Sequence, residues 1–245
     1  SLKPTDASYL TSLTKSQIIA DLKKYVVASV EPRIVDPSIL FVEMSSKIYY
    51  NSGMTDQTPA NIRDKVISSI QTYIDESDTE KFNGKFRYSK FVGVIDDADV
   101  SINSNLTSLT MRKDFYPQLN STFYYEVCFQ NAFDSDCDDP VLSSTGFRVT
   151  EYPNFDVYVE DRSGKIVLYR LDTVTGEKVV LDSNIGDIDY VKGELKMYAL
   201  TIIKGSFFDN RISLRVKPLS NDIKAMREVY LDVDVPNSSF TAYKE

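Results

Sequence analysis

The second half of this sequence is divided into short strand-like runs, and this feature restricts the possible folds most strongly. After Pro117, runs rich in β-branched and aromatic residues alternate with turn signals such as Ser163-Gly164 and Thr175-Gly176. The runs are Phe123–Phe129, Phe147–Thr150, Phe155–Glu160, Ile166–Leu171, Lys178–Leu181, Leu195–Ile203, Arg211–Val216 and Glu228–Val235. We therefore expect residues 117–245 to form a predominantly antiparallel β domain, with one helical turn near Ile223–Arg227.

The first half combines helix and strand signals. The even positions from Leu40 to Tyr50 are mostly apolar, and polar residues stand between them, which is the period-two pattern of a strand with one buried face. Thr58-Pro59 is a strong helix start, and Ser89 begins a shorter helix. A second strand is expected from about Val100 to Phe115. The predicted fold class is therefore α+β, with a strand-helix-helix-strand unit over residues 31–116.

Residues 1–30 are expected to form a leader and an amphipathic helix. Thr14 and Gln17 have the spacing of a capping box at the start of a helix. The apolar residues that follow at helical spacing are Ile18, Ile19, Leu22, Tyr25 and Val26. A face of this kind is more typical of a core than of a partner site.

The sequence contains no histidine, and this lowers the expectation of an enzyme. Without histidine there is no Ser-His or Cys-His nucleophile pair, no His general base and no His metal ligand. Glycine-rich phosphate loops are also missing. We expect a protein that is not an enzyme and that has no cofactor and no small-molecule substrate.

The net charge of −8 is concentrated in the second half. Residues 1–116 carry 14 basic and 15 acidic side chains, whereas residues 117–245 carry 14 basic and 21 acidic ones. Nucleic-acid binding needs a basic excess, and anionic membranes repel acidic surfaces. We therefore expect neither nucleic acid nor a membrane as a partner.

The ends and the cysteines give further expectations. No signal peptide or membrane-length apolar run is present, and the first residue is Ser1, so we expect a fragment or a processed product of a longer chain. Cys128 and Cys137 form no disulfide framework, and reduced thiols in the cytoplasm are the favoured interpretation.

Two groups of carboxylates are candidates for a metal site or a catalytic site. Asp134 to Asp139 resembles the start of a calcium loop, but Asp139 stands where the loop needs Gly and Thr145 where it needs Glu. A solvated acidic loop is favoured, and no metal site is predicted. Asp187, Asp189 and Glu194 could supply a catalytic carboxylate pair, but surface charge is the better interpretation. No catalytic residue is predicted.

Aromatic side chains are the best candidates for contacts with a partner. Phe207-Phe208 lies between Gly205 and Asp209-Asn210, where a hairpin connection is expected. Neighbours along an extended chain point to opposite sides, so at least one Phe should reach solvent or a partner. Tyr124 and Tyr49 fall on the polar sides of their strands and are weaker candidates.

The stretch from Ile34 to Lys113 resembles the baseplate J-like family of contractile tails. The likeness rests on Pro37 through Tyr50, on Thr58-Pro59, on Arg87 through Phe91, on Ile95-Asp96, and on Ser101-Ile102 with Met111-Arg112-Lys113. Ser183 through Tyr190, followed by Gly193, is similar to the C-terminal part of the large baseplate wedge subunit of T-even-type contractile-tailed phages.

This resemblance implies a structural component of the virion tail baseplate, assembled in the host cytoplasm. It further implies a wedge subunit that forms homodimers, binds other wedge and hub proteins, helps to close a ring around the tail hub, and rearranges when the sheath contracts. Two other functions remain open. One is a β-rich adhesin or carbohydrate-binding module, with or without the assistance of calcium, and the other is an Asp/Glu glycosidase.

Overall fold

The computed structural model describes residues 12–26, 31–34, 38–135, 139–226 and 229–245. Within these ranges it contains three α-helices, one 3-10 helix and fourteen strands. The helices are α1 (Ser12–Lys23), α2 (Pro59–Glu76), α3 (Tyr88–Asp96) and η1 (Val235–Asn237). The strands are β1 (Ser38–Tyr50), β2 (Lys85–Phe86), β3 (Ile102–Phe115), β4 (Thr122–Cys128), β5 (Leu142–Ser144), β6 (Phe147–Val149), β7 (Tyr152–Arg162), β8 (Lys165–Leu171), β9 (Lys178–Asp189), β10 (Glu194–Lys204), β11 (Ile212–Val216), β12 (Ile223–Lys224), β13 (Val229–Val233) and β14 (Ser239–Lys244).

The predicted α+β class, with its N-terminal strand-helix-helix-strand unit and a following antiparallel β domain, is wrong, because the protein is mostly β. Strands β1 and β3 belong to one twelve-stranded sheet that continues through the rest of the chain. Strand β11 pairs with β3, while β13 and β14 pair with β1. Both β13 and β14 run parallel to β1, which ties the end of the chain to its first strand.

The burial pattern of strand β1 shows that it lies inside a large sheet. Its even positions from Leu40 to Tyr50 are all buried, as the alternation predicts, but Ile39, Phe41 and Glu43 are buried as well. The first half of β1 is therefore covered on both faces, which is typical of a strand inside a large sheet. Only the second half has one open face, where Ser45 and Lys47 are exposed.

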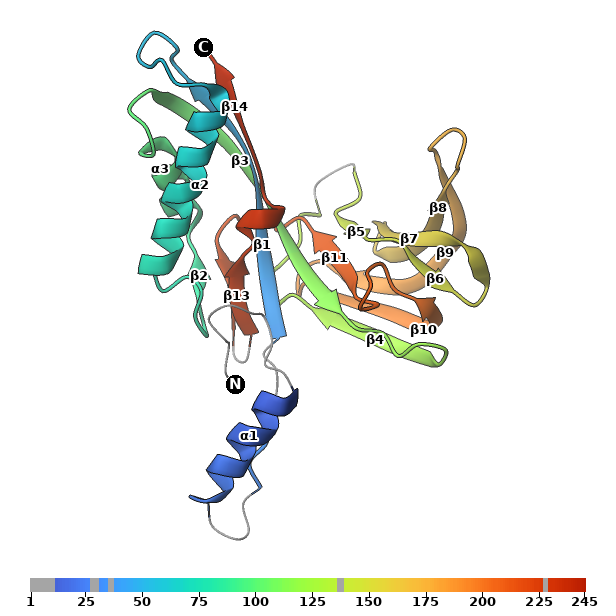
Figure 1. Ribbon diagram of the computed structural model, residues 1–245. Helices are drawn as coiled ribbons and strands as arrows, with labels where there is room; N and C mark the ends of the chain where they lie inside the picture. The colour runs from blue at the N-terminus through green and yellow to red at the C-terminus, as the bar shows by residue number, and fades with distance from the viewer. Residues whose placement is uncertain (1–11, 27–30, 35–37, 136–138, 227–228) are drawn as a thin grey trace.

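Helices α2 and α3 cover one side of the sheet at one end of the molecule (Figure 1). The Thr58 hydroxyl accepts a hydrogen bond from the Asn61 backbone at 3.3 Å, and Pro59 is the first helical residue, so the predicted helix start is confirmed. Apolar residues at helical spacing on α2 are buried, namely Ile62, Val66, Ile70 and Ile74. On α3, Phe91 stacks on Phe86 with ring centroids 4.1 Å apart.

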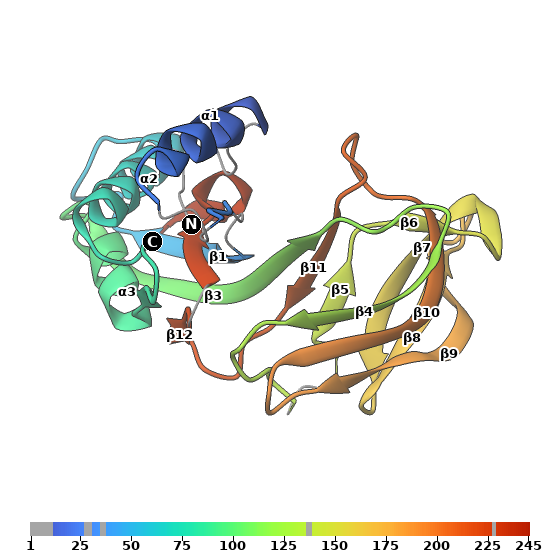
Figure 2. The same cartoon turned by 90° about the horizontal axis from the view of Figure 1, so that it is seen from below.

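The other end of the molecule is a closed ring of strands (Figure 2). Strands β7, β6, β10, β9 and β8 pair in that order, and β8 pairs back to β7. At Gly186 the chain of β9 passes so close to β10 that an added Cβ would lie 2.2 Å from the Lys196 carbonyl oxygen. Glycine is therefore required there by the close approach of two backbones.

Several local predictions also need correction. Ile223 and Lys224 form β12, which pairs with β2, so the helical turn expected near Ile223–Arg227 is wrong. Strand β14 was not predicted. Helix α1 is present, but Leu22 within it and Tyr25 after it are 43% and 86% exposed, so the face expected in a core is not buried. None of the described helices is long and apolar enough to cross a membrane.

Candidate interaction surfaces

The loop of residues 205–211 carries the two predicted contact residues and joins β10 to β11. The Ser206 backbone N–H donates to the Arg211 carbonyl oxygen at 3.0 Å, which closes the loop at its base. Phe208 is fully exposed, with a relative accessibility of 107%, whereas Phe207 is 40% exposed. The loop therefore presents one Phe side chain entirely to solvent.

Phe207 is held in place by the side chain of Arg211. The guanidinium of Arg211 lies 4.3 Å from the centre of the Phe207 ring, and the same group is 3.3 Å from Asp114. Tyr116, which is 51% exposed, donates a hydrogen bond from its hydroxyl to Asp209 at 3.4 Å. Burial, and then the nearby Asp209 carboxylate, raise the pKa of Tyr116.

We call Tyr116, Phe207 and Phe208 the aromatic patch. Tyr116 was not predicted from the sequence, because it belongs to the turn after β3 and lies 91 positions before Phe207 in the chain. The only available signal was an aromatic residue beside Pro117 at the start of a turn. Aromatic side chains that combine a large apolar area with few rotatable bonds are the residue type most favoured at interfaces.

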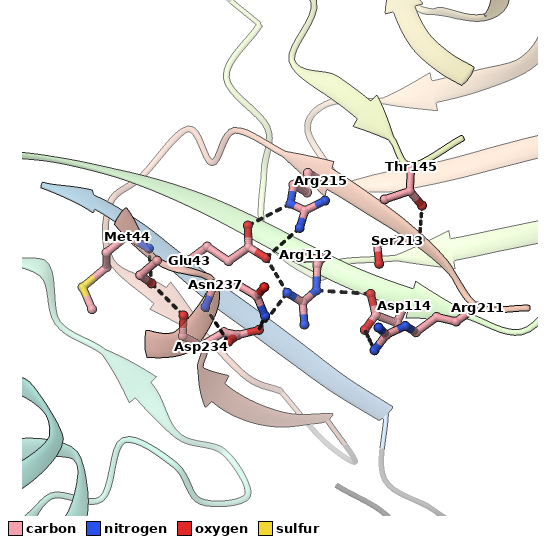
Figure 3. Close-up of polar contacts among 11 residues, drawn as sticks. Glu43, Met44, Arg112, Asp114, Thr145, Arg211, Ser213, Arg215, Asp234 and Asn237 are labelled. Carbon is pink, nitrogen blue, oxygen red and sulfur yellow. Dashed lines mark hydrogen bonds and ion pairs between the residues drawn. The ribbon is translucent and has the colours of Figure 1, made fainter. Parts of the chain in front are cut away.

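Arg211 also belongs to a network of buried charges (Figure 3). Arg112, whose side chain is 6% exposed, pairs with Glu43, with Asp114 at 3.2 Å and with Asp234 at 2.7 Å. Burial alone would lower the pKa of Arg112, but the three carboxylates outweigh it, and the pKa is raised. The guanidinium therefore stays charged inside the protein.

Two further arginines complete this network. Arg215 donates from its Nε to Glu43 at 2.8 Å, and Arg211 pairs with Asp114. Three cations and three carboxylates thus balance one another in charge. Because a buried charge is tolerated only when it is paired and hydrogen-bonded, these contacts fix the relative positions of β1, β3 and β11.

The network also holds the turn before β14. The backbone N–H of Asn237 donates to the Asp234 carboxylate at 3.1 Å, and the Ser238 hydroxyl donates to the Asp234 carbonyl oxygen at 2.7 Å. The Met44 N–H then donates to the Ser238 hydroxyl at 2.9 Å. Through Arg112 and Arg211, the aromatic patch is therefore connected to the strands under the helices.

The other two predicted contact residues lie elsewhere. Tyr124 is 78% exposed on β4. Tyr49 is partly buried and stacks on Tyr243 of β14, with ring centroids 5.7 Å apart. This pair lies on the sheet face opposite the helices, which also carries Leu106, 63% exposed. The structure thus brings Phe207 and Phe208 together with Tyr116 but leaves Tyr49 on a separate surface.

Residues 38–114, from the start of β1 almost to the end of β3, match the family model described as "Baseplate structural protein gp6, C-terminal domain III". This part of the chain resembles a phage baseplate domain. A relative is the baseplate wedge protein gp6 of Enterobacteria phage T4, which is 30% identical over 112 residues. The aligned part covers 46% of this chain and 17% of that protein.

The matched span contains β1, α2, α3 and most of β3, with Glu43, Arg112 and Asp114 of the charge network. Both matches are to phage baseplate proteins, whereas the likeness to the J-like family stays a prediction. The loop with Phe207 and Phe208 lies outside the matched residues.

Two of the three candidate catalytic carboxylates, Asp187 and Asp189, pair with lysines. Lys165 lies 2.6 Å from Asp187, and its hydrogen bond lowers the pKa of that carboxylate. Asp189 accepts a hydrogen bond from the Lys192 backbone and pairs with its side chain at 3.2 Å, and its pKa is lowered too. A general acid needs a raised pKa, so these groups do not have the properties of a proton donor.

The acidic loop of Asp134 to Asp139 lies partly outside the described residues, which exclude 136–138 with Cys137. At its start, Asp134 pairs with Lys217 at 2.7 Å. Over the parts of the chain that the structure describes, no three Cys, Asp or Glu side chains are grouped so as to hold a metal ion.

Proposed function

We propose that this chain is a structural part of the baseplate wedge of a contractile phage tail. The observation that supports this most directly is the match of residues 38–114 to a C-terminal domain of a baseplate structural protein. The role is mechanical rather than catalytic. The buried charges of the Arg112 network are paired with one another.

Self-association through the aromatic patch is the first part of this proposal. Phe208 offers a complete apolar side chain to a partner, and burying it is worth roughly 2 kcal/mol. The patch belongs largely to the β-rich half, whose acidic excess argues against a purely electrostatic contact between copies. An interface with an apolar centre and a polar rim is therefore favoured.

A second surface allows the assembly to grow beyond a pair. Closed rings need two different patches on each subunit, or a pair that repeats around an axis. The open sheet face with Tyr49, Tyr243 and Leu106 is exposed on different elements from the aromatic patch. We assign this face to contacts with neighbouring wedge and hub proteins in a ring around the tail hub that rearranges on sheath contraction.

Sedimentation velocity of the whole chain over a range of concentrations tests the self-association. We expect dimers, and we expect Phe208→Ser to weaken the dimer by about tenfold or more, since each 1.4 kcal/mol is about tenfold. Val174→Ser is the matched control, because Val174 is 91% exposed in the turn between β8 and β9. It should leave the dissociation constant unchanged.

Phe207→Ser separates folding from association. Since Phe207 packs under Arg211, its loss should lower the melting temperature more than the loss of Phe208 does. A strictly monomeric chain at high concentration would disprove self-association. Equal weakening by Phe208→Ser and Val174→Ser would show that the aromatic patch is not the interface.

A further inference from the structure

A polar cleft of about 630 Å³ lies between the end of β3 and β4. We call it the β3–β4 cleft, and among its lining residues are Ser38, Lys113, Glu126, Cys128 and Gln130. The two strands follow each other in the chain without pairing, since β3 pairs with β1 and β11 and β4 pairs with β10 (Figure 2). The cleft thus separates two strands that a simple hairpin would join.

Lys113 is buried in the wall of this cleft, and its ammonium has no anionic partner among the described residues. The residue is 8% exposed, and its ammonium donates to the Ser38 hydroxyl at 3.0 Å. Over the described ranges, no carboxylate pairs with it. Burial lowers the pKa of Lys113. An ammonium has three donors and is costly to bury unpaired, so this position favours an incoming anion.

The side-chain oxygen of Gln130 lacks a hydrogen-bond donor among the described residues. The side-chain oxygen Oε1 of Gln130 is buried and, within the described part of the chain, accepts no hydrogen bond. Lys113 needs an acceptor, whereas Gln130 needs a donor. A simple anion would satisfy only the lysine.

The backbone of β4 is open toward the same space. The Phe129 N–H donates to the Gly193 carbonyl oxygen at 2.8 Å, so alternate residues from Phe129 backward bond to β10. Glu126 and Cys128 lie between these positions and direct their N–H and C=O groups away from β10. Among the described strands, β10 alone pairs with β4, so this edge is free for another strand.

We propose that the β3–β4 cleft binds an extended segment of a neighbouring protein chain that carries an Asp or Glu side chain. The carboxylate pairs with the Lys113 ammonium, a donor of the segment reaches Gln130, and its main chain adds to the edge of β4. A peptide supplies all three, whereas a free anion supplies one. Glu126 already has Lys196 at 3.5 Å, so the acidic residue belongs beside Lys113. This inference does not rest on the proposed function.

Selection from random displayed heptapeptides on the immobilised whole chain tests the proposal. We expect the enriched peptides to share one acidic residue flanked by β-branched residues. The best peptide, measured by fluorescence anisotropy, should bind Lys113→Met at least tenfold more weakly. Lys90→Met is the matched control, because Lys90 is exposed on α3, and it should bind within twofold of the unchanged protein.

The peptide side gives a test that does not depend on a protein variant. Changing the acidic residue of the best peptide to its amide should weaken binding to the unchanged protein at least tenfold. Lys113→Met should itself fold, with an equal or higher melting temperature, because it removes an uncompensated buried charge. Enrichment without a shared acidic residue, no enrichment, or equal binding by the acid and amide peptides would each overturn the proposal.

Discussion

Replacing Arg112 with Met should destabilise the protein by about 3–5 kcal/mol, the cost of breaking a buried ion pair from one side. The side chain is 6% exposed and binds three carboxylates that are 10% exposed or less. Methionine retains much of the apolar stem of Arg112, so the effect comes mainly from the charge. It should exceed that of any exposed ion pair in the chain.

The magnitude follows from what remains after the substitution. Glu43 keeps Arg215, and Asp114 keeps Arg211. Asp234 keeps its hydrogen bonds to Asn237 but loses its ion pair with Arg112. One buried negative charge is therefore left over. Changing Asp234 to Asn in the Arg112→Met background should recover part of the loss.

Urea unfolding at neutral pH, followed by circular dichroism, measures this loss directly. Arg63→Met is the matched control, because the Arg63 side chain is 45% exposed and pairs with Asp64 on the surface of α2. Its effect should stay within about 0.5 kcal/mol. A loss below about 1 kcal/mol for Arg112→Met, or no recovery in the double variant, would refute the role given to the network.

Three further predictions concern single contacts. Thr58→Ala removes the cap of α2 and should cost about 1 kcal/mol in urea unfolding, while an unchanged midpoint would contradict the cap. The hydrogen bond from Lys65 lowers the pKa of Asp99 from 3.8 to about 2, so its stabilisation is complete above 3.8 and is lost as the pH falls through about 2. The free energy of unfolding of the unchanged protein should exceed that of Asp99→Asn by about 1–2 kcal/mol at neutral pH, a value that allows for the solvent exposure of Lys65. A difference of the same size at pH 2 would contradict this prediction. Gly186→Ala places a Cβ 2.2 Å from the Lys196 carbonyl oxygen and should cost about 2 kcal/mol or more in thermal unfolding, and a melting temperature within a degree would contradict the close approach.

Local patterns in the sequence determined several elements of this protein. The even positions of β1 from Leu40 to Tyr50 are buried because successive side chains on a strand point to opposite faces. The start of α2 follows from the Thr58 hydroxyl, which accepts a backbone hydrogen bond, and from Pro59, which has no backbone N–H that would need a partner in the first turn. These features depend on residues within one or two turns of each other, so the sequence expresses them directly.

The fold class was missed for a reason that also lies in β1. Its first half is buried on both faces and pairs with β13, more than 180 positions away in the chain. Strand pairing uses backbone groups that every residue has, so the sequence does not indicate which strand pairs with β1. The parallel pairing of β14 with β1 was hidden for the same reason.

For the candidate sites too, the sequence predicted some features and only the tertiary structure decided the others. The sequence alone indicated that Phe207 and Phe208 could not both be buried, because neighbours on an extended chain point apart, and Phe208 is fully exposed. Only the tertiary structure placed Tyr116 beside them, joined Arg112 to its three carboxylates and buried Lys113 in a cleft without a described carboxylate partner. Charges and aromatic rings interact through space over a few ångströms, and the folded backbone alone decides which distant residues come that close.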